Sequence, residues 1–240
     1  MKINSMKTSF SLLAAFALAG SLQISSAADV TGKITLKGTP PPEKPITLDA
    51  VCGKMQPDGI KSRFYVVGDG GALANVFVYI KEGAKASEAT GEGPVLDQVG
   101  CQYQPYVLGV QTGQKIKIRN SDATLHNVHA TPKLNKEFNF AQVTKGQINE
   151  RAFEKSEVMV RMKCDVHPWM FAYVGVVDHP YFAVTGADGS FKLPGVPAGK
   201  YTVEAFHMKA GSATKEITVG ADGNVTADFT FEYKAPVATP

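Results

Sequence analysis

Histidine, cysteine and tryptophan are scarce in this sequence, which has five histidines, three cysteines and one tryptophan among 240 residues. So few histidines leave little material for two separate metal centres, and no second histidine cluster is visible. A serine nucleophile elbow, a metalloprotease helix and a haem-attachment motif are also absent. These absences remove the commonest routes to hydrolytic and haem chemistry, and we expect a protein that is not an enzyme.

Excess charge and long apolar runs are limited as well. The formal net charge is +3, and no block of like charge stands out. Nothing in this balance points to nucleic acid or to an anionic membrane surface as a partner. The apolar run at residues 10–22 is too short to cross a bilayer comfortably. We therefore expect no membrane span in the mature chain.

Residues 1–28 have the features of a secretory signal peptide. Lys2 and Lys7 provide a basic start, the apolar run follows, and the small residues Ser26 and Ala28 precede the expected cleavage site. An N-terminal membrane anchor is the alternative. Cleavage would reduce the 25 basic residues to 23 against 22 acidic ones, a formal charge of +1. We expect a secreted protein, located in a bacterial periplasm.

Glycine and proline recur along the chain, with 23 and 14 copies, and the apolar runs between them are short. This pattern favours many short strands and predicts an all-β fold. A short apolar strand is expected at 64–67, and residues 138–150 are the one place with room for a short helix. Residues 82–94 are small, polar and glycine-rich, as in an exposed linker. Alternation or β-rich composition predicts the longer strands at 30–37, 74–81, 97–107, 114–119, 157–164, 173–177, 200–207, 215–219 and 225–231.

The stretch MKCDVHPWM spaces Cys164, His167 and Met170 three residues apart. A thiolate, two imidazoles and a weak axial thioether are the ligands of an electron-transfer copper site. The second imidazole is available upstream in LHNVHA, from either His126 or His129. In an extended segment these two rings face opposite sides, so one of them can join Cys164. Alternation along 157–164 places Val158, Val160, Met162 and Cys164 on one core-facing side of the strand.

Residues 94–178 resemble the cupredoxins, the small blue copper proteins, with a ligand loop most like that of amicyanin. The matching pattern is GQKIKIRNSD, then LHNVH, then CDVHPWM and a closing strand. The resemblance implies a Greek-key β-sandwich and selects His126 over His129. It implies one type 1 copper held by His126, Cys164, His167 and Met170, with Asn127 joining the two ligand loops. Pro168 and Trp169 are candidates for a patch where electrons enter, with packing into the sandwich as the alternative for Trp169.

The flanking segments resemble the carboxypeptidase regulatory-like (transthyretin-like, immunoglobulin-like) β-sandwich. VTGADGSFKLPGVPAGKYTVEA carries this resemblance, together with VTGKITLKG and NVFVYIK before the copper block. We expect a discontinuous sandwich of residues 29–93 and 179–234 with the cupredoxin inserted between strands, followed by a tail at 235–240. Three consecutive units are the alternative. Insertion is physically tolerable because the two ends of a surface loop lie close together.

Three cysteines in an exported chain suggest one pair and one thiol with another role. Cys164 has the metal-site context, which leaves Cys52 and Cys101 as the expected disulfide in an oxidising compartment. The alternative is that both are buried free thiols.

Together these patterns predict an exported mononuclear blue copper protein that transfers single electrons with a redox partner protein not identified by the sequence. A copper-binding or copper-delivery protein without electron transfer is the first alternative. An adhesion or scaffold module with a structural metal is the second.

Overall fold

Strands dominate the computed structural model, which describes residues 27–220 and 223–235. The all-β class is confirmed. Nearly all of the expected signal peptide (1–28) and most of the expected tail (235–240) lie outside the described residues. Within the described ranges no helix is long and apolar enough to cross a membrane. The elements are β1 (Ala27–Lys37), α1 (Ala50–Met55), η1 (Asp69–Gly71), β2 (Phe77–Glu82), β3 (Val95–Gln98), β4 (Tyr103–Gln104), β5 (Val107–Gln111), β6 (Ile116–Asn120), β7 (His126–Thr131), β8 (Phe138–Gln142), β9 (Ile148–Arg151), β10 (Glu157–Lys163), β11 (Phe171–Val177), β12 (Phe182–Val184), β13 (Ser190–Pro197), β14 (Gly199–His207), β15 (Gly211–Val219), β16 (Val225–Thr226) and β17 (Phe229–Glu232).

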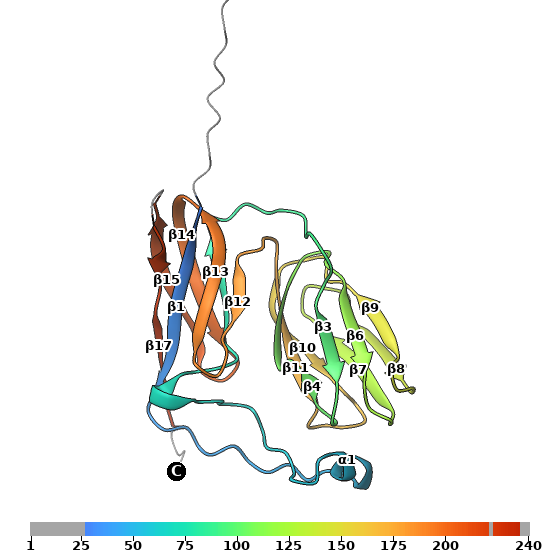
Figure 1. The fold of residues 1–240 in the computed structure, drawn as a ribbon. Helices are drawn as coiled ribbons and strands as arrows, with labels where there is room; N and C mark the ends of the chain where they lie inside the picture. The colour runs from blue at the N-terminus through green and yellow to red at the C-terminus, as the bar shows by residue number, and fades with distance from the viewer. Residues whose placement is uncertain (1–26, 221–222, 236–240) are drawn as a thin grey trace, which may run out of the picture.

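Two β-sandwiches stand side by side (Figure 1). The first sandwich combines a sheet of β13, β1 and β16, in which β17 also pairs with β1, with a sheet in the order β12-β2-β14-β15. The second sandwich combines the sheet β5-β11-β10-β7-β8 with the sheet β4-β3-β6-β9. All strands of the second sandwich come from one continuous stretch of chain, between β2 and β12.

The first sandwich joins strands from both ends of the chain. β1 pairs antiparallel with β13 and parallel with β16 and β17, so the blue strand of Figure 1 stands among orange and red ones. β2 pairs antiparallel with β12 and β14. Inward-facing residues of these strands form one fully buried apolar core, which includes Val30, Ile34, Val76, Val78, Leu193 and Val203.

The second sandwich has its own apolar core, built from alternate residues of its strands. Ile116 and Ile118 of β6 and Val128 and Ala130 of β7 are fully buried, as period-2 alternation requires. Met162, Cys164, Met170 and Val174 belong to the same cluster. Two of the expected metal ligands, Cys164 and Met170, are therefore part of this core.

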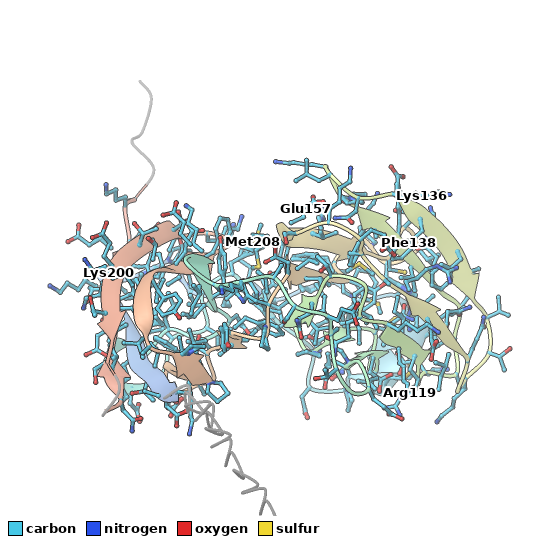
Figure 2. The ribbon with its side chains drawn as sticks, turned by 90° about the horizontal axis from the view of Figure 1, so that it is seen from above. Arg119, Lys136, Phe138, Glu157, Lys200 and Met208 are labelled. Carbon is cyan, nitrogen blue, oxygen red and sulfur yellow. A yellow bond between two sulfur atoms is a disulfide. The ribbon has the colours of Figure 1, made fainter. Side chains whose placement is uncertain are left out.

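A third apolar cluster joins the two sandwiches. Phe77 of β2 is completely buried against β5 and β11. A Cβ atom built on Gly175 would lie 2.5 Å from the Phe77 ring, and one built on Gly109 would lie 2.4 Å from Phe182. The two glycines thus provide flat backbone against which aromatic rings of the first sandwich pack. Met208, at the junction in Figure 2, packs against the same cluster.

Between β1 and β2 the chain leaves the first sandwich and runs to the far end of the second, where α1 lies (Figure 1). Its outgoing and returning arms pair briefly, with the amide of Ile46 donating to the carbonyl of Ile60 at 2.9 Å. Cys52 in α1 forms a disulfide with Cys101, which confirms the predicted pair and leaves Cys164 as the remaining thiol.

Three local predictions were wrong. Residues 64–67 form no strand. They belong to the returning arm, where the Phe64 ring lies 6.2 Å from the ring of Phe171. Residues 138–150 hold β8 and β9 instead of a helix, because stacking of Phe138 on Phe140 and Phe153 favours extended chain. Val158 does not share the core of Cys164, because a bulge at Met159 (φ 65°) shifts the register of β10.

Candidate metal centre

Four side chains singled out by the sequence lie at one end of the second sandwich. His126 opens β7, Cys164 directly follows β10, and His167 and Met170 belong to the turn before β11. Their exposed fractions are 0%, 2%, 4% and 1%, respectively. The turn is closed by two hydrogen bonds, from the amide of Cys164 to the carbonyl of Met170 and from the amide of Met170 to the carbonyl of His167, each 2.9 Å long. These bonds hold Cys164, His167 and Met170 together in one compact turn.

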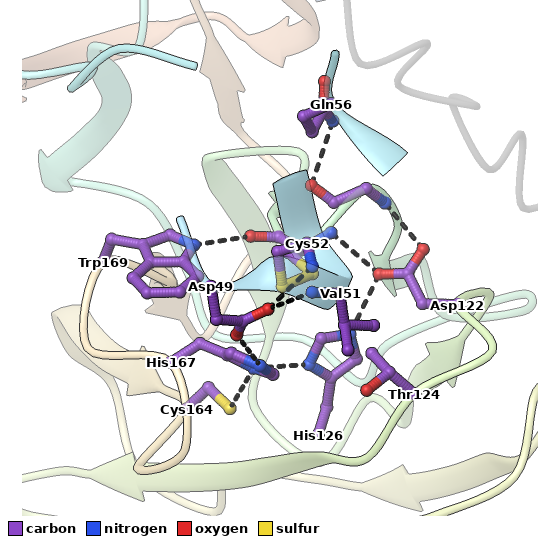
Figure 3. The surroundings of a disulfide bond; sticks show 12 residues. Asp49, Val51, Cys52, Gln56, Asp122, Thr124, His126, Cys164, His167 and Trp169 are labelled. Carbon is purple, nitrogen blue, oxygen red and sulfur yellow. Dashed lines mark hydrogen bonds and ion pairs between the residues drawn. A yellow bond between two sulfur atoms is a disulfide. The ribbon is translucent and has the colours of Figure 1, made fainter. Parts of the chain in front are cut away.

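Three donor atoms converge beneath α1 (Figure 3). The Nδ1 atoms of His126 and His167 are 3.0 Å apart, and Cys164 Sγ lies 3.6 Å from His167 Nδ1. All three donor atoms lie within 4.8 Å of one another. Met170 is buried in the same apolar cluster as Cys164. The structure thus brings two imidazoles and the thiol together, with the thioether in the neighbouring core.

The opposite nitrogen of each imidazole faces a carboxylate. His126 Nε2 lies 2.9 Å from Asp122 Oδ2, and His167 Nε2 lies 3.2 Å from Asp49 Oδ2. Asp122 is itself held, because it accepts hydrogen bonds from the amides of Gly100 and Cys101 at 2.7 and 2.8 Å. A carboxylate at Nε2 holds a proton there and leaves Nδ1 as the atom that can bind a metal.

The pKa values of the three groups are coupled. Burial lowers the pKa of His126, but hydrogen bonds with Asp122 and Cys164 outweigh burial and raise this pKa to about 8. Burial raises the pKa of the Cys164 thiol, yet the bond with His126 and nearby backbone amides bring it below its ordinary value. For His167, burial and then the charge of His126 lower the pKa. These opposite pKa shifts favour a proton on His126 over one on His167, and the two Nδ1 atoms lie 3.0 Å apart.

Asn127 connects the two ligand loops. Its backbone amide donates to Cys164 Sγ at 3.4 Å, and its side-chain oxygen accepts the amide of Asp165. Its side-chain nitrogen donates to Asn139 and Asp165 at 2.6 and 3.3 Å. These contacts place one amide hydrogen bond on the thiol and tie β7 to the Cys164 turn.

The other histidines lie outside the centre. His129 points to the opposite side of β7, where its two ring nitrogens lie 2.7 Å from Asp165 and 2.7 Å from Glu137. His179 and His207 belong to the first sandwich, where His179 Nε2 is 2.7 Å from the carbonyl of Ile80. Of the two histidines that the spacing offers, His126 and His129, the structure places His126 beside Cys164.

Trp169 and Pro168 follow His167 at the rim of the turn. The Trp169 ring is half-buried, lies 5.3 Å from the His167 ring, and donates through Nε1 to the carbonyl of Cys101 at 3.2 Å. Pro168 is exposed. The aromatic ring thus contacts both the candidate centre and the disulfide-bearing loop.

Sequence reasoning missed Asp49 and Asp122. Asp122 stands four residues before His126, a spacing that offered a weak signal. Asp49 offered none, because it reaches His167 only through the excursion between β1 and β2.

A family model for the carboxypeptidase regulatory-like domain matches residues 165–232. Most of this match covers β12 to β17, which belong to the first sandwich. Its first residues cover the ligand turn and β11, whose strand pairs within the second sandwich. A comparison with curated proteins finds no match.

Solved cupredoxin structures are similar to part of the chain. A copper-containing nitrite reductase from Thermus scotoductus SA-01 is 21% identical over 42% of this chain and 25% of that chain, with a TM-score of 0.34. A purple cupredoxin from Nitrosopumilus maritimus is 22% identical over 35% and 99% of the two chains, with a TM-score of 0.31. A mutant of amicyanin in its Cu(I) state is 23% identical over 41% and 97%, with a TM-score of 0.32. The chain thus spans a quarter of the nitrite reductase.

Proposed function

We propose that this protein is an exported, mononuclear type 1 copper protein that carries single electrons. The observation that carries the proposal is the convergence of His126 Nδ1, His167 Nδ1 and Cys164 Sγ within 4.8 Å of one another. All three side chains are almost fully buried. Such a set of two imidazoles and one thiolate, with a methionine in the adjoining core, is the donor set of an electron-transfer copper site.

The residues present fit copper in charge and in softness. A bound copper ion supplies a single electron by alternating between Cu(II) and Cu(I). His126, His167 and Cys164 would hold it, and the Met170 thioether, buried in the same cluster as Cys164, would be a further, weaker ligand. Binding would displace any proton from the Nδ1 atoms of His126 and His167, because an imidazole binds metal in its neutral form. The amide of Asn127, 3.4 Å from the thiol sulfur, would withdraw charge from the thiolate and so tune the potential.

Rigidity of the donors supports an electron-transfer role over a delivery role. Each donor is attached to a strand end or a closed turn, and its partner atoms are themselves hydrogen-bonded. A site held in this way changes little between two charge states, whereas a delivery site needs a path for the metal to leave. Export is supported by the disulfide, which belongs to oxidising compartments.

Copper titration followed by visible absorption tests this proposal. Wild-type protein should bind one Cu(II) and develop an intense thiolate-to-copper charge-transfer band. Cys164→Ser should abolish the band, and His126→Ala should disrupt it strongly. His129→Ala is the matched control, because this ring lies on the other face of the same strand, and it should keep the colour. Retention of the band in Cys164→Ser would show that the assigned site is wrong.

A further inference from the structure

The segment Asp49–Gln56, which we call the α1 cap, lies over the imidazole edge of the candidate centre (Figure 3). Three contacts tie it to the second sandwich. Asp49 pairs with His167 at 3.2 Å, Cys52 is bonded to Cys101, and Gln56 Nε2 donates to the carbonyl of Gly100 at 3.0 Å. The cap belongs to the excursion from the first sandwich. It covers the candidate centre but contributes none of the four predicted ligands.

Asp49 is held so that one oxygen faces His167. Its Oδ1 accepts the amides of Val51 and Cys52, both at 2.8 Å, and thereby caps the first turn of α1. The other oxygen, Oδ2, is left to accept the proton on His167 Nε2. This arrangement fixes the ring's tautomer and turns its Nδ1 lone pair towards Cys164 and His126.

The disulfide is the strongest of the three ties. A helix of six residues is not stable alone in water, so α1 depends on what holds it in place. Cys52 and Cys101 are completely buried, and their sulfur atoms lie within 4.8 Å of a ring nitrogen of His167. The covalent bond therefore fixes the cap directly beside the imidazole that it covers.

We propose that Asp49 is a positioning residue for His167, and that the α1 cap, latched by the Cys52–Cys101 bond, closes the imidazole edge of the site. The expected effects on metal exchange and on partner approach rest on the proposed function. The covering of His167 by the cap does not depend on that function, because it can be tested in protein without copper. Closure slows the exchange of metal and directs any partner's approach away from the His167 edge.

Chemical modification of the copper-free protein tests the latch. Diethyl pyrocarbonate is applied to wild type and to the double variant Cys52→Ser with Cys101→Ser, and modification of each histidine is measured by peptide mass spectrometry. Opening of the cap should speed modification of His167 by about ten-fold, because a buried group reacts through local opening and this factor corresponds to about 1.4 kcal/mol less protection. His129 and His179 are internal references, because neither contacts the cap, and their rates should not change.

Equal His167 rates in the two proteins, with unchanged reference rates, would overturn the latch. If the double variant unfolds, all five histidines react faster together. Asp49→Ala then decides, because it keeps the disulfide but removes the carboxylate that lies 3.2 Å from His167 Nε2. A selective increase at His167 in Asp49→Ala supports closure by the cap, and no increase contradicts it.

Copper-loaded protein tests the role of Asp49. Asp49→Asn keeps a side-chain oxygen for capping α1 but removes the negative charge that faces His167. We expect loss of Cu(II) to a chelator to become about ten-fold faster, with a shifted charge-transfer band, because partners of metal-bound histidines typically contribute factors of this size. Asp58→Asn is the matched control, since Asp58 is exposed in the same excursion, and it should change neither.

Identical copper loss and spectra for Asp49→Asn and Asp58→Asn would show that Asp49 does not position His167. Failure of wild type to bind copper at all would contradict the proposed function. The modification experiment would still decide whether the α1 cap closes over His167.

Discussion

Each imidazole of the candidate centre uses one nitrogen towards Cys164 and the other towards a carboxylate. The two carboxylates come from different places: Asp122 precedes His126 on the same loop, whereas Asp49 comes from the excursion that carries α1. Because both are fixed by backbone amides, the two Nδ1 atoms face each other before any metal binds. Preorganisation of this kind lowers the cost of ordering the ligands on binding.

Met170→Leu tests whether the Met170 thioether is a weak copper ligand. The substitution keeps the volume and apolar character of a side chain that is 1% exposed, so the fold should be retained. Loss of a weak thioether donor disfavours Cu(II), and the reduction potential should rise while the visible band remains. Met162→Leu, in the same core cluster, is the control and should leave the potential unchanged. A wild-type potential in Met170→Leu would place Met170 away from the metal.

His207 gives the first sandwich a pH dependence. Burial lowers the pKa of His207 to about 4, and its Nδ1 accepts hydrogen bonds from the amides of Lys209 and Ala210. The unfolded chain has a histidine pKa of about 6.5, so it takes up the proton first as the pH falls. Stability from the neutral ring is thus complete above that value and is lost towards pH 4. The loss amounts to about 3 kcal/mol.

Urea unfolding of wild type and His207→Gln, between about pH 4 and about pH 6.5, measures how much the neutral His207 ring contributes to stability. Wild type should lose stability more steeply than the variant, which cannot take up a proton at that position. Parallel pH profiles of the free energy of unfolding would rule out a buried neutral His207.

At the scale of elements, the junction between the sandwiches depends on close packing of rings on glycine backbone. Gly175 in β11 faces the completely buried ring of Phe77 in β2. Alternate sides of β11 serve different cores: Val174 packs inside the second sandwich, and Tyr173 packs in the cluster at the junction. One strand therefore carries the Met170 turn at one end and the junction along its length.

Gly175→Ala should destabilise this junction. The new methyl group would lie 2.5 Å from the Phe77 ring. Inserting an extra carbon into a well-packed core typically lowers the free energy of unfolding by about 1–3 kcal/mol. Thermal unfolding should show the loss. Gly186→Ala is the control, because only one atom, 3.5 Å away, lies near its added carbon. Equal stability of the two variants would show that the sandwiches do not depend on this contact.

Strands with one buried face were predictable from the sequence. Irregular features, such as a bulge within a strand, were not. Alternation in KITLK and QKIKIR indicated β1 and β6, because period-2 burial leaves a direct trace in the sequence. The bulge at Met159 left no such trace, since an inserted residue shifts the register without changing composition. The position of α1 was predictable only through its disulfide, because the cysteine count indicated the Cys52–Cys101 pair. The pairing of Asp49 with His167 joins residues far apart in the sequence, and no local pattern indicated it.

At the scale of the whole molecule, the first sandwich needs both ends of the chain. β1 lies between β13 and the last strands, and β2 lies between β12 and β14. The second sandwich begins after the mostly exposed residues 82–94 and ends with β11, just before β12. Strand pairing thus joins segments that the second sandwich separates along the chain.

A fragment of residues 179–240 should not fold. Without β1 and β2, the buried faces of β13 and β14 would meet water, and their edges would be free to aggregate. Circular dichroism and analytical ultracentrifugation of the fragment measure this. A cooperative, monomeric fragment would contradict the dependence on β1 and β2. Co-expression with residues 27–93 is the complementary control and should restore soluble protein.

Voltammetry of the copper-loaded chain, without residues 1–28, tests the central claim most directly. If His126, Cys164, His167 and Met170 form an electron-transfer site, the protein should give a single reversible one-electron wave. The visible band should bleach on reduction and return on reoxidation, with one copper retained through repeated cycles in the presence of a chelator. Loss of copper on the first reduction, or the absence of a wave from protein that binds copper, would contradict the account and favour copper delivery.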